Sequence, residues 1–285
     1  MNRTLPTALL TPAVTALLIW MAVPLAMTVY FSLVDYSLMN PGPLSFVGLD
    51  NYAFFITDPD FWPAVLNTLQ LISTVVVVTV VFGIGLALLV NEPFPGRGLV
   101  RVLLISPFFV MPTVNALLWK HLMMNPIYGV LASVWRFFGA EPVDWMTHYP
   151  LLAVTIMLTW QWLPFACLIF MTSLQSMDRE QLEAARMDGA NAWQCFHYLT
   201  LPHLARAIAV VIMIEMIFLL GVFAEISITT AGGPGNESTN LTYLIYKQAL
   251  LNFDVGSASA GALFAVILAN IVAAFMLRVI GRNLD

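Results

Sequence analysis

Charged residues are the scarcest class in this sequence. Lys, Arg, Asp and Glu make up only 9% of the 285 residues, whereas a soluble domain carries about 25%. Hydrophobic residues account for 60% of the chain, and the mean hydropathy is +0.86. A water-soluble fold of this length could not hide so much apolar surface, which excludes an ordinary soluble protein. The scarcity of Lys and Arg also argues against a surface that binds nucleic acid.

Cysteine and lysine are rare as well. The two cysteines, Cys167 and Cys195, lack metal-ligand spacing, and we expect both to be small buried apolar residues. Neither Lys120 nor Lys247 follows a glycine-rich loop, and no GxxxxGK[ST] sequence occurs. The chain therefore has no P-loop for a nucleotide, and we expect no cofactor or metal site of its own. If the chain is a transporter, its energy must come from an ion gradient or from another polypeptide.

Long apolar segments dominate what is present. A helix of about 20 residues spans the hydrocarbon layer, and six segments reach roughly that length, which predicts one all-α membrane domain over residues 1–285. The third segment is the least regular, because Pro107 and Pro112 interrupt it. The first is too long for a signal peptide, so we expect a retained anchor. The predicted spans are Thr7–Leu33, Thr68–Val90, Val102–Trp119, Leu151–Ser173, Ala207–Ile228 and Ala258–Ile280.

Positive charges indicate the orientation, because Lys and Arg prefer the cytoplasmic side of short loops. With the N-terminus inside, eight of the eleven Lys and Arg residues fall on the cytoplasmic side. The first outer loop, 34–67, holds aspartates but no Lys or Arg. In the next outer loop, the aromatic residues of 125–149 suit a short helix in the membrane interface. Both termini and the polar segment 179–206 are therefore predicted to be cytoplasmic.

The segment Arg179–Arg206, here called the bracket, is a polar stretch between two apolar runs. Its residues 182–187 favour a helix, and Gly189 permits a tight change of direction. Residues 190–198 are predicted to form a second short helix, and Pro202 suits the first turn of the helix that follows. The pattern predicts a helix-turn-helix that projects into the cytoplasm, with Glu183 and Asp188 available to pair with Arg or Lys of a partner.

The spacing inside the bracket resembles the signature EAA-x3-G-x9-I-x-LP of permease subunits in binding-protein-dependent ABC importers. The departure is Leu199, where isoleucine is usual. Further stretches look like the carbohydrate branch of these permeases: FVGLDNY at 46–52, NTL at 67–69, NP and YG within 125–129, and GGP at 232–234. Residues 228–261 look most like sorbitol and mannitol permeases.

The resemblance implies a type I importer permease fold in a bacterial inner membrane, without enzymatic activity. It implies a second permease subunit, two ATPase subunits that bind ATP and Mg²⁺, and an extracytoplasmic binding protein that delivers a sugar or sugar alcohol. Each bracket would insert into a cleft of one ATPase. An amino-acid or peptide substrate, or less readily an ion-coupled carrier, is the alternative. The implied coupling residues are Glu183, Ala184, Ala185, Asp188, Gly189, Leu201 and Pro202.

Candidates for the solute path are polar and aromatic residues near mid-membrane, since sugars are recognised by amides, carboxylates and flat apolar surfaces. For Asn115 and Gln161, a hydrogen bond between helices is an equal alternative. Glu215 is a candidate because an unpaired carboxylate in lipid is costly, but it could also be protonated or paired with the partner permease. The resemblance adds weight to the stretch before the GGP turn. The candidates are Asn115, Trp160, Gln161, Glu215, Phe218, Phe223 and Glu225.

Overall fold

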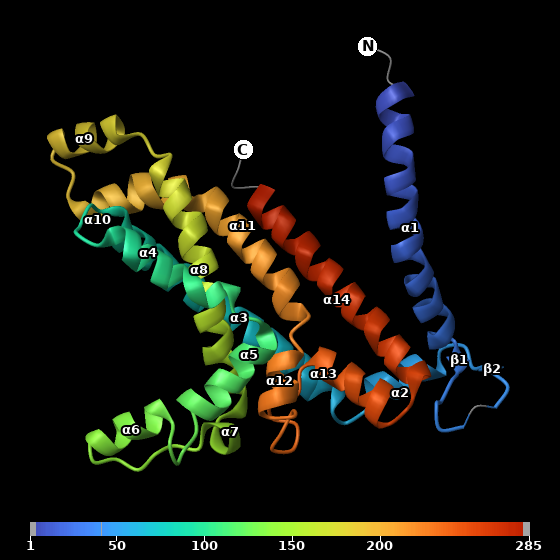
Figure 1. Ribbon diagram of the computed structural model, residues 1–285. Coiled ribbons are helices and arrows are strands. Elements are labelled where there is room, and N and C mark those ends of the chain that lie inside the picture. Colours follow the sequence, from blue (N-terminus) through green and yellow to red (C-terminus); the bar gives the residue numbers. More distant parts are fainter. Residues whose placement is uncertain (1–3, 41, 282–285) are drawn as a thin grey trace. The chain divides into compact units, whose positions relative to one another are not determined.

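The computed structural model describes residues 4–40 and 42–281, and most of them are helical (Figure 1). The long helices are α1 (Thr4–Ser32), α3 (Phe61–Asn91), α8 (Pro150–Gln175), α11 (Leu201–Leu220) and α14 (Val255–Gly281). The short helices and strands are α2 (Asp50–Thr57), α4 (Arg97–Ile105), α5 (Pro112–Leu117), α6 (Val130–Phe137), α7 (Trp145–His148), α9 (Arg179–Met187), α10 (Ala192–Cys195), α12 (Ala224–Thr229), α13 (Leu241–Tyr246), β1 (Val34–Asp35) and β2 (Ser45–Phe46).

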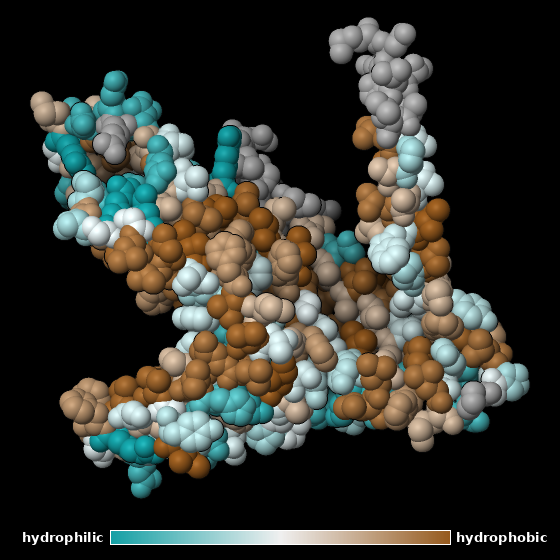
Figure 2. Space-filling view, in the orientation of Figure 1, coloured by the Kyte–Doolittle hydropathy of each residue, from teal (hydrophilic) through white to brown (hydrophobic). Residues whose placement is uncertain are grey.

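Within the described residues, five helices are long and apolar enough to cross a membrane, and a sixth crossing exists if one bent pair counts as a single span. These helices expose many large apolar side chains, and apolar residues cover much of the helical surface drawn in Figure 2. Their surfaces suit lipid, as the composition predicts. The first, second, fourth and sixth predicted spans coincide with α1, α3, α8 and α14 to within several residues.

The third predicted span, Val102–Trp119, is not one straight helix. Its two halves, Arg97–Phe109 and Pro112–Met123, meet at an angle of 99°. A 3₁₀ turn at Ser106–Phe109 ends the first half, and Pro112 opens α5 in the second. Proline removes a backbone donor, so the helix breaks where the two prolines stand.

The fifth predicted span, Ala207–Ile228, also needs correction. Helix α11 ends at Leu220, and a non-helical step at Gly221–Phe223 separates it from α12. At its other end, helical structure begins earlier than predicted, because a π-helical turn at Phe196–Thr200 runs directly into α11. Pro202 lies in the first turn of α11, as predicted.

Contacts divide the chain into two units, of which unit 1 contains the described residues of 1–62 and 244–268. In unit 1, β1 pairs antiparallel with β2, Val34 opposite Phe46. The amide of Asn51 donates to the carbonyl oxygens of Ser32 (3.0 Å) and Val34 (2.9 Å), which holds α2 to the end of α1. Gly261 of α14 lies directly against the ring of the buried Phe55, where a Cβ would overlap the ring.

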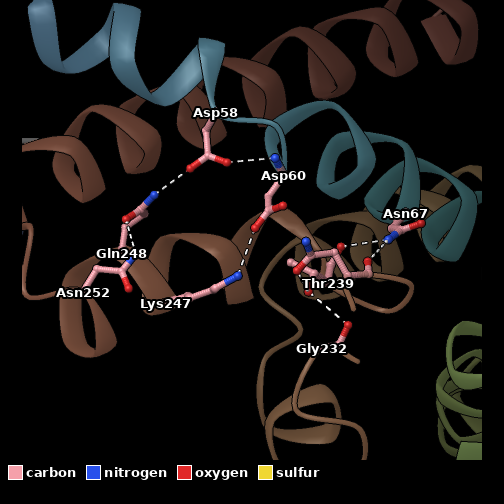
Figure 3. A network of polar contacts seen from close by, with 9 residues as sticks. Asp58, Asp60, Asn67, Gly232, Thr239, Lys247, Gln248 and Asn252 are labelled. Atoms are coloured by element: carbon pink, nitrogen blue, oxygen red, sulfur yellow. Dashed lines mark hydrogen bonds and ion pairs between the residues drawn. The ribbon is translucent and has the colours of Figure 1, made fainter. Parts of the chain in front are cut away.

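A polar network in unit 1 joins the turn after α2 to the chain after α13 (Figure 3). Lys247 forms an ion pair with Asp60 at 2.9 Å, and Gln248 donates to the Asp58 carboxylate at 2.8 Å. Gln248 also accepts from Asn252 at 2.7 Å. The contacts to Asp60 and Asp58 connect positions 187 and 190 residues apart in sequence, so they tie the first outer loop to the last one.

Unit 2 contains residues 63–243 and the described part of 269–285. Its core cluster comes mainly from α3, α8 and α11 and includes Ala87, Phe170, Leu174 and Leu204. Helices α9 and α10 lie at one end of this unit, and α6 and α7 lie at the other (Figure 1). Hydrophilic side chains gather over α9 and α10 in Figure 2. The predicted short helix of segment 125–149 corresponds to α6, with α7 as a second short helix.

Candidate functional site

The bracket forms the predicted pair of helices, and local signals define the first of them. The Asp178 side chain caps α9 by accepting a backbone hydrogen bond of 2.9 Å. Gly189 has a φ of 91°, and its N–H donates to the Arg186 carbonyl at 3.1 Å while the Ala190 N–H reaches the Ala185 carbonyl at 3.0 Å. This is a Schellman ending, which needs a left-handed residue where glycine has no steric penalty. The turn predicted at Gly189 is therefore present.

The second helix is shorter than predicted. Asn191 and Gln194 form a reciprocal capping box at the start of α10, with hydrogen bonds of 2.8 and 2.9 Å. After Cys195 the helix changes to the π-helical turn, so residues 190–198 are not one regular helix. Cys195 and Cys167 are both buried, as expected of small apolar residues.

The bracket is connected to the membrane helices at both ends. Leu201 packs against the core cluster of α3, α8 and α11. A ring nitrogen of His203, on α11, lies 2.9 Å from the Ser173 carbonyl oxygen of α8. Leu204 is completely buried in the same region. The bracket is therefore in direct contact with α8 and α11.

Most of the predicted coupling residues face outward. Glu183, Ala184, Asp188 and Gly189 are exposed, and Ala185 is half-buried. Leu201 is half-buried and Pro202 exposed in the first turn of α11, so both belong to the return into the membrane.

Three exposed apolar side chains of the bracket were missed by the sequence reasoning. Met187 is 88% exposed, Trp193 70% and Tyr198 71%. The indole of Trp193 stacks on the ring of His197 at a centroid distance of 6.1 Å, which helps to hold it outward. Large apolar residues in an otherwise polar segment are the signal that could have found them, because such residues anchor protein interfaces.

Among the solute-path candidates, Asn115 and Gln161 lie together. The Asn115 amide donates to the Gln161 side-chain oxygen at 2.8 Å, and Gln161 donates to the Val110 carbonyl at 2.7 Å. Both side chains are buried. In this structure the two residues therefore form a hydrogen bond between helices, which was the alternative to solute contact. This bond holds the bent third segment against α8.

Glu215 is separate from that pair. Its side chain is completely buried, and one carboxyl oxygen lies 2.6 Å from the Thr79 hydroxyl of α3. The other oxygen has no hydrogen-bond partner among the described residues. No cation pairs with Glu215 in the described part of the chain. In this structure the residue joins α11 to α3 and does not face an open path.

The aromatic candidates differ in exposure. Trp160 is half-buried and meets Trp119 edge to face at 5.8 Å. Phe218 is exposed, and its ring lies 5.3 Å from that of Trp162. The exposed Phe218 and the half-buried Trp162 lie on adjoining helices, and aromatic rings offer a flat apolar surface of the kind that sugar rings contact.

The segment around Phe223 and Glu225 has the most irregular backbone of the candidate path. Phe223 stacks on Tyr243 at 6.0 Å in the step between α11 and α12. Glu225 is buried in the first turn of α12, and the ammonium of Lys120 donates to the Ile228 carbonyl near the end of α12 at 2.7 Å. A cation at a helix C-terminus is favourable, so Lys120, which the sequence did not suggest, positions α12.

The GGP turn is held by Thr239, which follows it in the chain, and by Asn67 of α3. Asn67 of α3 donates to the carbonyl oxygens of Asn236 (3.1 Å) and Thr239 (3.0 Å), and Thr239 donates to that of Gly232 (3.1 Å) (Figure 3). At Gly232, φ is 81°, and the Thr239 and Tyr243 side chains occupy the space that a Cβ would need. The irregular turn predicted here is therefore a fixed structure.

The described residues contain no group of three or more His, Cys, Asp or Glu side chains that could hold a metal ion.

Known proteins align with this chain over most of its length. Residues 79–285 match the family described as "Binding-protein-dependent transport system inner membrane component". The sulfoquinovosyl glycerol transport system permease protein SmoG of Agrobacterium fabrum is 32% identical over 98% of this chain and 91% of its own length. The trehalose/maltose transport system permease protein MalF of Thermococcus litoralis is 30% identical, over 90% of this chain and 88% of its own.

Solved structures agree on the architecture. A chain in the crystal structure of a bacterial alginate ABC transporter, in complex with an alginate pentasaccharide-bound periplasmic protein, superposes with a TM-score of 0.79. The two are 23% identical, and the match covers 96% of this chain and 93% of the other. The similarity is one of fold.

Proposed function

This chain belongs to the family of inner membrane components of binding-protein-dependent transport systems, and from that membership we propose that it helps to import a sugar or sugar alcohol. It is a multi-pass subunit of an ATP-driven importer in a bacterial inner membrane and is not itself an enzyme. The observation that carries the coupling role is the bracket, in which two capped helices stand at the cytoplasmic end of α8 and α11.

The proposed solute class rests on two kinds of support. The named systems of the similar permeases handle sulfoquinovosyl glycerol and trehalose or maltose, all of which are sugars or glycosides. The chain itself offers an aromatic pair, the exposed Phe218 beside the half-buried Trp162, and the buried carboxylate of Glu225 in the first turn of α12. Aromatic faces with a few polar groups are the usual recognition elements for such solutes.

The proposed assembly contains a second permease subunit, two ATPase subunits and an extracytoplasmic binding protein. ATP and Mg²⁺ bind to the ATPase subunits, since this sequence contains no P-loop. Each permease places its bracket in a cleft of one ATPase. In this chain Ala184 and Ala185 allow close approach, and Met187 and Trp193 supply the apolar anchors.

Motion of the ATPase subunits then reaches the membrane through Leu201 and Pro202. Because Leu201 packs on the core cluster and His203 bonds to α8, the bracket, α8 and α11 move as one body. That motion opens and closes the solute path between the two permeases.

The solute class is tested on the binding protein encoded beside this chain. A thermal-shift screen with disaccharides, sugar alcohols and amino acids identifies its ligand, and uptake of that radiolabelled ligand is then measured in cells with and without this chain. We expect stabilisation by a sugar or sugar alcohol, and uptake that depends on the chain. Stabilisation by amino acids alone would refute the proposed class.

A further inference from the structure

A polar cavity lies where α3 and α8 end and α9 begins. Its volume is about 490 Å³. One wall is the connection between α3 and α4, with Glu92 and Arg97, and the opposite wall is α9, with Glu183 and Arg186. The cavity therefore separates the bracket from a neighbouring cytoplasmic turn of the same unit.

The charges around this cavity are unpaired. It is lined by two carboxylates and two guanidinium groups, yet none of them forms an ion pair in the described part of the chain. The Nε atom of Arg97 is buried and has no hydrogen-bond acceptor there. That atom is closed off from the cavity, but the guanidinium groups of Arg97 and Arg186 line the cavity without an ion pair, so it favours a ligand that brings an anionic acceptor.

The position of the cavity relative to the membrane indicates the source of such a ligand. Helices α3 and α8 are membrane spans, and their last residues, Asn91 and Gln175, line the cavity. The cavity thus lies at the level where hydrocarbon gives way to lipid headgroups. Helix α4 starts at Arg97 and exposes Leu99, Val102 and Leu103, which provide an apolar surface for acyl chains beside it.

We propose that this cavity binds the headgroup of a phospholipid that carries both a phosphate and a primary ammonium group, as in phosphatidylethanolamine. The phosphate accepts from Arg97 and Arg186, and the ammonium donates to Glu92 and Glu183. A purely anionic headgroup meets two carboxylates, which oppose it. A choline headgroup has no N–H for them. Bound there, the lipid links α9 to the connection between α3 and α4 and steadies the bracket. The proposal does not depend on the identity of the solute.

The test uses native mass spectrometry of the full-length chain in micelles doped with equal amounts of phosphatidylethanolamine, phosphatidylglycerol and phosphatidylcholine. We expect the wild type to retain phosphatidylethanolamine preferentially. Retention should fall about tenfold in Arg97→Gln, the loss expected when a charge-assisted bond to phosphate is removed, and should also fall in Glu92→Gln, an exposed position that is safe for folding. Arg206→Gln, which removes an exposed arginine of α11 outside the cavity, should retain the lipid like the wild type.

Three results would overturn the proposal. If the chain retains phosphatidylglycerol more than phosphatidylethanolamine, and Glu92→Gln has no effect, then the arginines simply attract anionic lipid. Equal retention of all three lipids would mean that the cavity only holds water. Unselective retention together with loss of ATPase binding in Arg97→Gln would assign the cavity to the ATPase interface, while leaving the importer function intact.

Discussion

Replacement of Gly189 tests the coupling surface at the residue that shapes it. Its φ of 91° lies in the region that favours glycine, and a Cβ built there meets nothing within 4 Å. The substitution therefore causes no clash inside the chain, and its cost comes from the backbone. An L-residue in the left-handed conformation costs about 1–2 kcal/mol, with β-branched residues the worst and Asn tolerated best.

The expected magnitudes follow from that strain. A penalty of about 1–2 kcal/mol reduces the population of the correct turn about 5- to 30-fold. We expect Gly189→Val to weaken binding of the ATPase to the membrane-embedded chain by about that factor, Gly189→Ala by less, and Gly189→Asn least. Binding is measured by titrating labelled ATPase onto the chain in nanodiscs, and melting temperatures check that insertion and folding are intact.

Two outcomes of this series are informative. Equal ATPase affinity in all four proteins would refute the placement of the coupling surface. A loss in Gly189→Asn as large as in Gly189→Val would show that side-chain volume matters more than backbone strain, which would place the ATPase surface in direct contact with the turn.

Three further predictions concern the membrane helices. Thr79→Val leaves the buried Glu215 without its 2.6 Å partner and should lower the free energy of unfolding by about 1–3 kcal/mol, whereas Thr79→Ser should not, as measured by denaturation in nanodiscs. Gly261→Val pushes methyl groups into a buried ring and should cost about 1–3 kcal/mol, visible as a lower melting temperature. Gln161→Ala should lower the melting temperature more than it weakens transport affinity. Glu225→Ala should raise the half-saturation concentration for uptake about tenfold with little change in melting temperature. The reverse pattern would mean that Gln161 contacts the solute and Glu225 holds the fold.

The parts of the fold that follow from local chemistry were predictable. The apolar lengths of the spans identified α1, α3, α8 and α14, and Gly189 indicated the turn of the bracket. Trp193 and Met187 could have been named from their apolar character in a polar segment. These features can be predicted because residues close together in the sequence determine them.

Other features depend on contacts that sequence patterns do not record. Pro107 and Pro112 indicate an interruption, but the 99° bend also reflects the bond from Gln161 to the Val110 carbonyl. The step at Gly221–Phe223 interrupts a continuous apolar run that reads as one helix. The ion pair between Asp60 and Lys247 joins residues 187 apart. Such pairings require the tertiary structure, and no local sequence pattern predicts them.

This chain should transport its solute only when a separate ATPase drives it. Uptake of the binding protein's ligand is measured in proteoliposomes that contain both permeases, with and without the ATPase subunits. ATP is supplied on the side of the membrane that the ATPase subunits face. We expect uptake only when ATPase, ATP and binding protein are all present. Uptake by the permeases alone, driven by a proton or sodium gradient, would contradict it.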